Sequence, residues 1–264
     1  MSRLRWRFWR PRPIPVLELH GTLTTRIGAL NIAGYGRLIE AAVAAAADGG
    51  TLLLDIESPG GSPVQSDLIA SRIRRLAGER KVRVIAVIGE VGASGGYWLA
   101  CAGDEIVANP MSVVGSIGVI GGGFGLGGAL ARLGVSRRLY TAGANKGRLD
   151  PFTPERPQDV AFLRELLGQL HERFKAWVRT RRGAALTGDE AAIFDGGWML
   201  GERALALGLI DRLGDLDAEV RRLGGAKARA LVFRPGRRGL LSRLPRLLAE
   251  TVVEALDTAA RPRL

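Results

Sequence analysis

Two related stretches decide the fold: T51-L-L-L-D-I-E-S-P-G-G-S62 and V82-R-V-I-A-V-I-G-E-V-G-A-S-G-G-Y-W98. Each begins with a continuous apolar run of strand length, at 51–56 and at 82–88, and continues into a glycine-rich loop. A run that is apolar at every position is typical of a strand buried on both faces, as in a parallel sheet. The sequence therefore predicts two buried, parallel strands, each followed by a loop.

Helical patterns lie between and around these strands. Apolar residues recur at helical spacing over 64–76, and an alanine-rich segment at 32–47 ends at a glycine pair. Further short apolar runs at 16–19 and 105–108 are strand candidates. Because strands and helices alternate, we predict an α/β fold of parallel strands joined by helical crossovers.

The second half of the chain is less regular. We expect a strand at 135–141 and a long amphipathic helix at 157–182. We interpret 224–239 as a linker and 240–256 as a last amphipathic helix. No internal repeat is found.

Charge is distributed unevenly along the 264 residues, which carry a formal net charge of +12. The basic excess lies in residues 1–13 and 220–264, whereas 14–219 is close to neutral. We therefore divide the chain into a basic aromatic start (1–13), a folded domain (14–219) and a basic linker with a helix (220–264). Because a nucleic-acid-binding domain usually carries its basic face on the folded body, we expect no nucleic-acid partner. The single cysteine and the two histidines leave no metal site or disulfide framework to expect.

Two segments bear on membrane contact. The start has no apolar core of signal-peptide length, but it interleaves aromatic rings with arginines, a composition suited to an anionic membrane surface as well as to a solvated basic tail. The residues that would make this contact are Arg3, Arg5, Trp6, Arg7 and Trp9. The uncharged stretch 106–131 is long enough to span a bilayer but too rich in glycine for a stable helix, so we interpret it as strand and loop. We expect a cytoplasmic protein, or one peripheral at the inner face of the membrane.

Ser94 is the candidate nucleophile, because it stands in the pattern G92-A-S-G-G96 directly after a strand. The loop containing Gly60 and Gly61 follows the neighbouring strand, and loops at the carboxyl ends of parallel strands face one crevice. Glycine pairs allow backbone N–H groups to turn toward a ligand, and such groups stabilise an oxyanion. The Gly95 N–H is the natural partner of Ser94 in this role.

Neither histidine is placed in the sequence where a base for Ser94 would be expected. His171 falls inside the long helix, where we expect a helix-surface residue, and His20 ends the first strand. A neutral lysine can serve instead when its surroundings lower its pKa. Of the four lysines, Lys146 stands apart in a loop of small residues, T141-A-G-A-N-K146, although an exposed loop lysine is the alternative interpretation.

Four motifs in order give the chain a family resemblance from about residue 16 to 214. They are S58-P-G-G61, G92-A-S-G-G-Y-W98, V114-G-S-I-G-V119, and A142-G-A-N-K146 followed by D150-P-F152. Together they resemble the signal peptide peptidase A family, serine–lysine peptidases of the ClpP/crotonase fold. The resemblance implies an α/β spiral of parallel strands with helical crossovers, in a single catalytic domain with C-terminal helices. It implies Ser94 as nucleophile, Lys146 as general base, and an oxyanion hole built from Gly95 and the Gly60–Gly61 pair.

The resemblance has further implications. Ser116 is expected to hydrogen-bond the lysine amine and orient it, and no cofactor or metal is expected. Family members form rings or domes, so a homo-oligomer acting on hydrophobic or unfolded peptides is implied. The chain departs from the family because it shows no membrane span. It has one catalytic unit, so serine and lysine are expected from the same polypeptide.

Two alternative functions remain open. A crotonase-type acyl-CoA enzyme would share the glycine-rich loops but would use a glutamate, for which Glu90 is the neighbouring candidate. A non-catalytic membrane-surface adaptor would keep the scaffold and would need neither Ser94 nor Lys146. The serine–lysine peptidase predicts activity that rises toward alkaline pH, as the lysine loses its proton.

Overall fold

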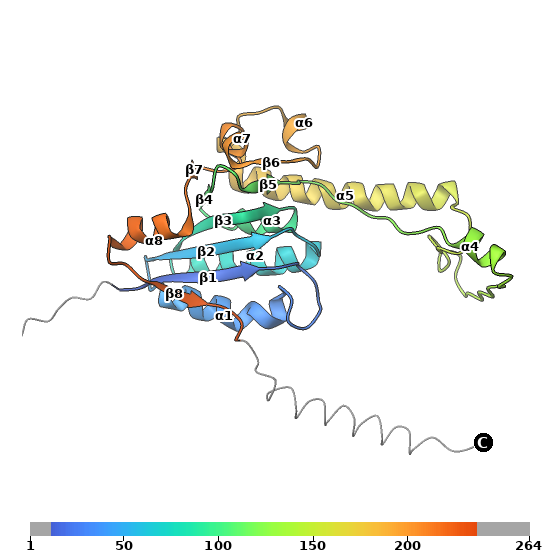
Figure 1. Cartoon of the computed structure of the whole chain (residues 1–264), viewed down its shortest axis with the longest axis horizontal. Coiled ribbons are helices and arrows are strands. Elements are labelled where there is room, and N and C mark those ends of the chain that lie inside the picture. Colours follow the sequence, from blue (N-terminus) through green and yellow to red (C-terminus); the bar gives the residue numbers. More distant parts are fainter. Residues whose placement is uncertain (1–11, 237–264) are drawn as a thin grey trace, which may run out of the picture. The chain divides into compact units, whose positions relative to one another are not determined.

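The computed structural model describes residues 12–236 of the chain. Figure 1 shows a central sheet with helices packed against it. The strands are β1 (Ile14–His20), β2 (Thr51–Ser58), β3 (Arg83–Ala93), β4 (Glu105–Ala108), β5 (Val113–Gly115), β6 (Trp198–Leu200), β7 (Arg212–Leu213) and β8 (Ala230–Phe233). The helices are α1 (Ile32–Ala45), α2 (Pro63–Glu79), α3 (Gly95–Ala100), α4 (Gly127–Arg132), α5 (Pro157–Arg182), α6 (Glu190–Ile193), α7 (Gly201–Ala206) and α8 (Leu216–Gly224), with a 3-10 turn at Gly183–Ala185.

The sheet has the order β6-β5-β3-β2-β1-β8, and β4 pairs with both β3 and β7. Every pair is parallel except β5 with β6. The helices α1 and α2 connect consecutive parallel strands, as the alternating pattern predicts. The expected α/β class with a mostly parallel sheet is therefore confirmed.

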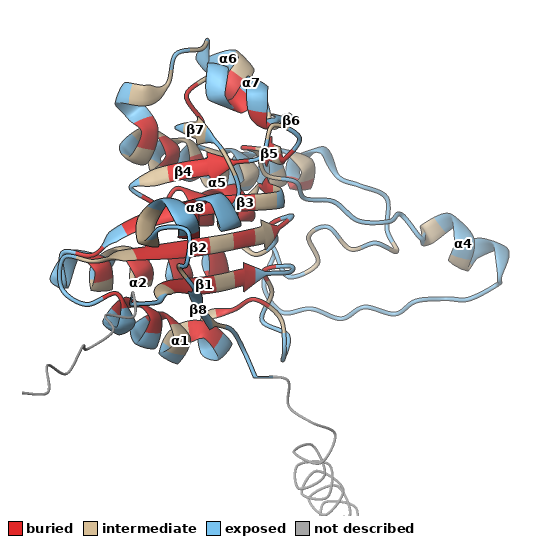
Figure 2. Cartoon of the chain, turned by 60° about the vertical axis from the view of Figure 1, so that its left-hand side comes forward, coloured by how far each residue is buried: buried red, intermediate tan, exposed pale blue. Residues whose placement is uncertain are grey.

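Both faces of the central strands are buried, which explains their continuous apolar sequence. One face carries the larger core, in which Leu52, Leu54 and Ile56 of β2 pack with residues of α1, α2, α3 and α5. On the other face, Leu53 and Ile85 belong to a smaller cluster with Val220 of α8. Figure 2 shows the buried strands, with α8 on the near side.

The sequence predicted the first half of the chain more closely than the second. The prediction of a strand at 135–141 is wrong, because these residues are exposed and pair with no other strand. An apolar run without a strand to pair with cannot form a ladder. The stretch expected as a linker contains β8, which pairs with β1. The long helix at 157–182 has the expected bounds.

The sheet-containing unit ends at Phe233, and the division of the chain at 13 and 219 stays a prediction. The expected helix at 240–256 and the aromatic residues of the start lie outside the described residues. Within 12–236, no helix combines the length and the apolar character that a bilayer crossing requires. The stretch 106–131 forms β4, β5, loop and the start of α4, as its glycine content predicts.

A buried arginine joins the long helix to the sheet. Arg182 at the end of α5 donates to the Gly208 carbonyl from Nε and Nη2, at 3.1 and 2.8 Å, and to both carboxylate oxygens of Asp211, at 2.8 and 3.0 Å. Asp211 also accepts from the Ile106 N–H of β4 at 2.6 Å. The Arg182 side chain is only 5% exposed, so its charge depends on these partners.

Replacing Arg182 by methionine should lower the free energy of unfolding by about 3 kcal/mol, because Asp211 and the Gly208 carbonyl would lose a buried partner. Urea unfolding followed by circular dichroism measures the change. The matched control is Arg75→Met in α2, whose pair with Glu79 is more than half exposed and should cost less than about 1 kcal/mol. Equal losses in the two variants would contradict the role assigned to Arg182.

Candidate active site

Ser94 lies at the turn between β3 and α3. Its backbone has φ +52° and ψ −121°, an uncommon conformation for a residue with a side chain. Two hydrogen bonds hold the turn: the Ser94 N–H donates to the Gly115 carbonyl at 2.8 Å, and the Trp98 N–H donates to the Ser94 carbonyl at 3.0 Å. A strained and fixed backbone at a serine is typical of a functional turn.

The Gly60–Gly61 loop lies directly against this turn. A Cβ atom placed on Gly60 would lie 2.6 Å from the Gly95 nitrogen and 2.8 Å from the Ser94 Cβ. Gly60 also has φ +98°, in the region that favours glycine. Two backbone segments can approach this closely only where no side chain separates them. The structure therefore brings Gly60, Gly61, Ser94 and Gly95 together, as expected for loops at the carboxyl ends of neighbouring parallel strands.

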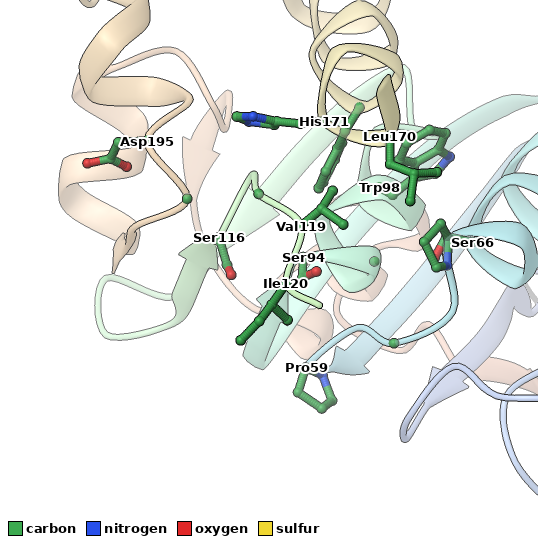
Figure 3. A pocket seen from close by; sticks show the side chains of 16 residues that line it. Pro59, Ser66, Ser94, Trp98, Ser116, Val119, Ile120, Leu170, His171 and Asp195 are labelled. Carbon is green, nitrogen blue, oxygen red and sulfur yellow. The ribbon is translucent and has the colours of Figure 1, made fainter. Parts of the chain in front are cut away.

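Ser94 opens into a cavity of about 590 Å³. Gly61 and Gly95 line it beside Ser94, and Ser116 lines it from the turn after β5. Figure 3 shows Ser94 and Ser116 near Val119 and Ile120, with Leu170 and Trp98 on another side. The remaining walls include Phe174 and Pro59. The cavity thus joins Ser94 and the glycine backbone beside it to aromatic and aliphatic side chains, with Ser66, His171 and Asp195 as polar members of the wall.

Ser116 is also held in an unusual conformation. Its φ is +53°, and its N–H donates to the Gly197 carbonyl at 2.6 Å. The Gly118 N–H donates back to the Ser116 carbonyl at 2.9 Å. The short turn at 115–118 is therefore fixed next to Ser94, and its Gly115 carbonyl is the acceptor for the Ser94 N–H.

Lys146 is not part of this cavity. It lies in the segment 120–156, called here the arm, which Figure 2 shows leading away from the sheet to α4 and returning to α5. The side chain is exposed, and the Lys146 N–H donates to the Gly143 carbonyl at 3.2 Å. Within one copy of the chain, the structure does not bring Lys146 to Ser94.

The two histidines differ from one another. His171 was expected on the helix surface, but it is partly buried and lines the cavity, where its Nε2 hydrogen-bonds the Ile117 carbonyl at 2.9 Å. The signal for this was its position between the apolar residues Leu170 and Phe174 on the inner side of α5. His20 hydrogen-bonds Asp55 at 2.9 Å, which raises the pKa of the imidazole. His20 does not line the cavity.

Other chemistry-bearing residues lie away from Ser94. Burial raises the pKa of the Cys101 thiol to about 12, so it is not a thiolate nucleophile at neutral pH. Glu90 is exposed within β3 and does not line the cavity. Among residues 12–236, no group of three or more His, Cys, Asp or Glu side chains could hold a metal ion.

A comparison with known families identifies the chain. The family described as Peptidase family S49 matches residues 77–229, more than half of the sequence. This chain belongs to peptidase family S49. The match includes the Ser94 turn, the turn at 115–118 and the arm. The mostly parallel α/β sheet of this chain is consistent with the ClpP/crotonase-like fold of S49 peptidases.

Of three curated relatives, two are named as peptidases and the third carries a different name. A putative protease of Synechocystis is 35% identical over 164 residues, which cover 62% of this chain and 58% of the relative. A putative signal peptide peptidase SppA of Enterococcus faecium is 29% identical over 163 residues, which cover 62% and 47%. A Brucella melitensis protein named as a Na⁺/H⁺ antiporter NhaA is 44% identical over 234 residues, which cover 87% of this chain but 31% of that protein. The S49 chain therefore spans between about a third and three fifths of the length of these relatives.

Substituting alanine for Gly60 should abolish peptidase activity, because the new Cβ would push the Ser94–Gly95 turn away from its position. The matched control is Gly49→Ala, since Gly49 has φ +78° but no heavy atom lies within 4 Å of a Cβ placed there. Both variants carry backbone strain, and only the first has the steric conflict. Hydrolysis of a fluorogenic peptide, with thermal unfolding as a fold check, measures the difference. Equal activity in the two variants would show that the close contact between Gly60 and the Ser94–Gly95 turn is not needed for activity.

Proposed function

We propose that the chain is a serine endopeptidase that cleaves hydrophobic or unfolded peptides with a serine–lysine dyad, Ser94 and Lys146. The observation that carries the proposal is the contact between the Ser94–Gly95 turn and the Gly60–Gly61 loop at the wall of a cavity. This arrangement sets a hydroxyl nucleophile beside backbone N–H groups that can donate hydrogen bonds to the oxyanion as its negative charge develops. Family S49 membership supports the same chemistry.

Three N–H groups, those of Gly60, Gly61 and Gly95, are candidates for the two positions of the oxyanion hole. The Gly60 N–H already donates to Ser58 Oγ at 3.2 Å. The Gly61 and Gly95 residues line the cavity beside Ser94. We therefore assign the oxyanion hole to the Gly61 and Gly95 N–H groups, with Gly60 supplying the close approach.

In the first step, the neutral Lys146 amine takes the proton of the Ser94 hydroxyl while Oγ forms a bond to the scissile carbonyl carbon. The carbonyl oxygen becomes an oxyanion in the hole. Collapse of this intermediate breaks the C–N bond, and the lysine ammonium gives its proton to the leaving amine. Water then repeats the sequence on the acyl-enzyme, with Lys146 again as the base, and releases Ser94.

The single catalytic unit predicts serine and lysine from the same polypeptide, but we propose instead that each site takes its lysine from a second copy of the chain. Lys146 is exposed on the arm and outside the cavity of its own chain. In a ring, the arm of one copy can reach the Ser94 cavity of its neighbour. Ser116, which faces that cavity, would then hydrogen-bond the incoming amine and orient it.

Exposed apolar side chains on the arm support this assembly. Phe124 is 84% exposed, Leu133 74% and Tyr140 88%. Apolar side chains gathered on one exposed segment are typical of a surface that a partner covers. A homo-oligomer is therefore part of the proposal.

The cavity wall supports an apolar substrate side chain. Trp98 and Phe174 are buried aromatic residues with ring centroids 5.0 Å apart, and both line the cavity. Leu170, Val119 and Ile120 add aliphatic surface. Burial of an apolar side chain against such a wall contributes binding free energy in proportion to its area.

A membrane contact through the basic aromatic start stays a prediction, because the residues that would make it lie outside the described ones: Arg3, Arg5, Trp6, Arg7 and Trp9. The acyl-CoA alternative has less support, since Glu90 is not at the cavity. The adaptor alternative has less support because family membership and the Ser94 turn point to a peptidase.

Co-expression of Ser94→Ala and Lys146→Ala chains should restore activity to about a quarter of the wild-type level, because that share of sites in a random ring combines an intact serine with an intact lysine. Each variant alone should be inactive. Hydrolysis of unfolded casein or a fluorogenic peptide by the purified oligomer is the measurement. No recovery in an oligomer shown to contain both chains would place both residues in one copy. Full activity of either single variant would overturn the dyad.

Activity should rise with pH through the neutral and alkaline range, because only the deprotonated amine of Lys146 can accept the Ser94 proton. The pH dependence of kcat/KM on a peptide without titratable groups measures this. Fluorescence at each pH checks that the fold persists. A flat profile from about pH 6 to pH 10 would contradict a lysine base.

A further inference from the structure

His171 is the one histidine that lines the Ser94 cavity among the described residues. It lies on α5, between Leu170 and the residues Phe174 and Trp177 that face α3. Figure 3 shows its ring reaching from α5 past Val119, on the side where Ser116 lies. In the proposed mechanism the proton moves between Ser94 and Lys146, so His171 takes no part in the chemical steps.

The hydrogen bond of His171 places a proton on one of its two ring nitrogens. Nε2 lies 2.9 Å from the Ile117 carbonyl oxygen, and a carbonyl oxygen can only accept. The Nε2 atom therefore carries the hydrogen, which leaves this nitrogen unable to take a proton from Ser94. His171 acts on the backbone at Ile117 and is not a general base through Nε2.

Ile117 belongs to the turn at 115–118 that supports Ser94. The Ile117 side chain is fully buried, and the Gly115 carbonyl of the same turn accepts the Ser94 N–H at 2.8 Å. Ser116 holds φ +53° in this turn, a conformation that needs support from its surroundings. One support is the Gly197 carbonyl, which accepts the Ser116 N–H at 2.6 Å. The bond from His171 is a second.

The same helix also holds the other side of the nucleophile. Trp177, six residues after His171, donates from Nε1 to the Trp98 carbonyl of α3 at 3.0 Å. The rings of Trp98 and Trp177 stack with centroids 6.0 Å apart. Helix α5 therefore contacts both segments that meet at Ser94: the helix that starts after it, and the turn that binds its N–H.

We propose that His171 is a positioning residue of the active site, which holds the 115–118 turn through the Ile117 carbonyl and thereby sets the position of Ser94 and Ser116. The proposal rests on the proposed function, in which Ser94 is the nucleophile. Without the bond, the Ile117 carbonyl loses a partner and the strained turn can relax. A small displacement of Ser94 relative to the oxyanion N–H groups lowers the rate more than it weakens substrate binding.

The test compares His171→Leu, which removes the donor, with His171→Gln, whose Nε2–H can reach the same carbonyl. In the full-length oligomer, we expect His171→Leu to lower kcat about tenfold, with KM within about twofold. His171→Gln should restore kcat to within about threefold of wild type. The rate at which a fluorophosphonate labels Ser94 should follow kcat in both variants.

Arg181→Leu is the matched control for a merely structural contact of α5. Arg181 donates from Nε to the Cys101 carbonyl at 2.8 Å and from Nη2 to the Gly103 carbonyl at 2.9 Å, and it does not line the cavity. This variant should lower the melting temperature and leave kcat unchanged. A loss of kcat in His171→Leu but not in Arg181→Leu would show that His171 positions Ser94 and does not merely attach α5 to the rest of the fold.

Wild-type kcat in His171→Leu, or equal loss in the leucine and glutamine variants, would overturn the proposal. If His171→Leu does not fold, ¹⁵N NMR of the wild-type protein decides the matter, because the proposal requires a proton on Nε2 and a ring protonated only on Nδ1 excludes it. Full activity in Ser94→Ala would instead overturn the proposed function. An inactive Ser94→Ala protein with a fully active His171→Leu protein would overturn this inference alone.

Discussion

The site depends on the close approach of two backbone turns, one at Gly60 and one at Ser94–Gly95. The approach is possible because β2 and β3 run parallel, and a register shift after the Ile56–Ile88 pair places Ser58 opposite Gly92 at their carboxyl ends. A side chain on Gly60 would occupy the space of the Gly95 nitrogen. The sheet therefore does more than provide a core: the pairing of β2 with β3 brings Ser94, the proposed nucleophile, beside the glycines of the proposed oxyanion hole.

Helix α5 adds a constraint from a distant part of the sequence. It packs Phe174 against Trp98 and hydrogen-bonds the turn after β5 through His171. These contacts join the apolar wall of the cavity to the strained backbone at Ser116 and Ser94. Arg182 at the end of the same helix is fixed by Asp211, so the helix is held at both the cavity and the sheet.

The arm differs from the sheet in that its own chain does not bury its apolar side chains. Its residues are almost all exposed, and it carries Lys146 away from the cavity of its own chain. A segment with this much exposed apolar surface gains stability by contact with another molecule. In the proposed oligomer, the arm is the part of the chain that would carry Lys146 to the Ser94 cavity of the next copy.

Sequence alone determined the elements whose patterns are local: the buried strands at 51–56 and 82–88, the long helix at 157–182, and the turns that carry Gly60, Gly61, Ser94 and Ser116. Continuous apolar runs, helical spacing and glycine pairs each restrict the backbone within a few neighbouring residues. Tertiary structure alone decided the rest. Whether residues 135–141 find a partner strand, whether 230–233 join β1, which way His171 faces and how far Lys146 lies from Ser94 all depend on contacts between segments distant in sequence, which local patterns do not encode.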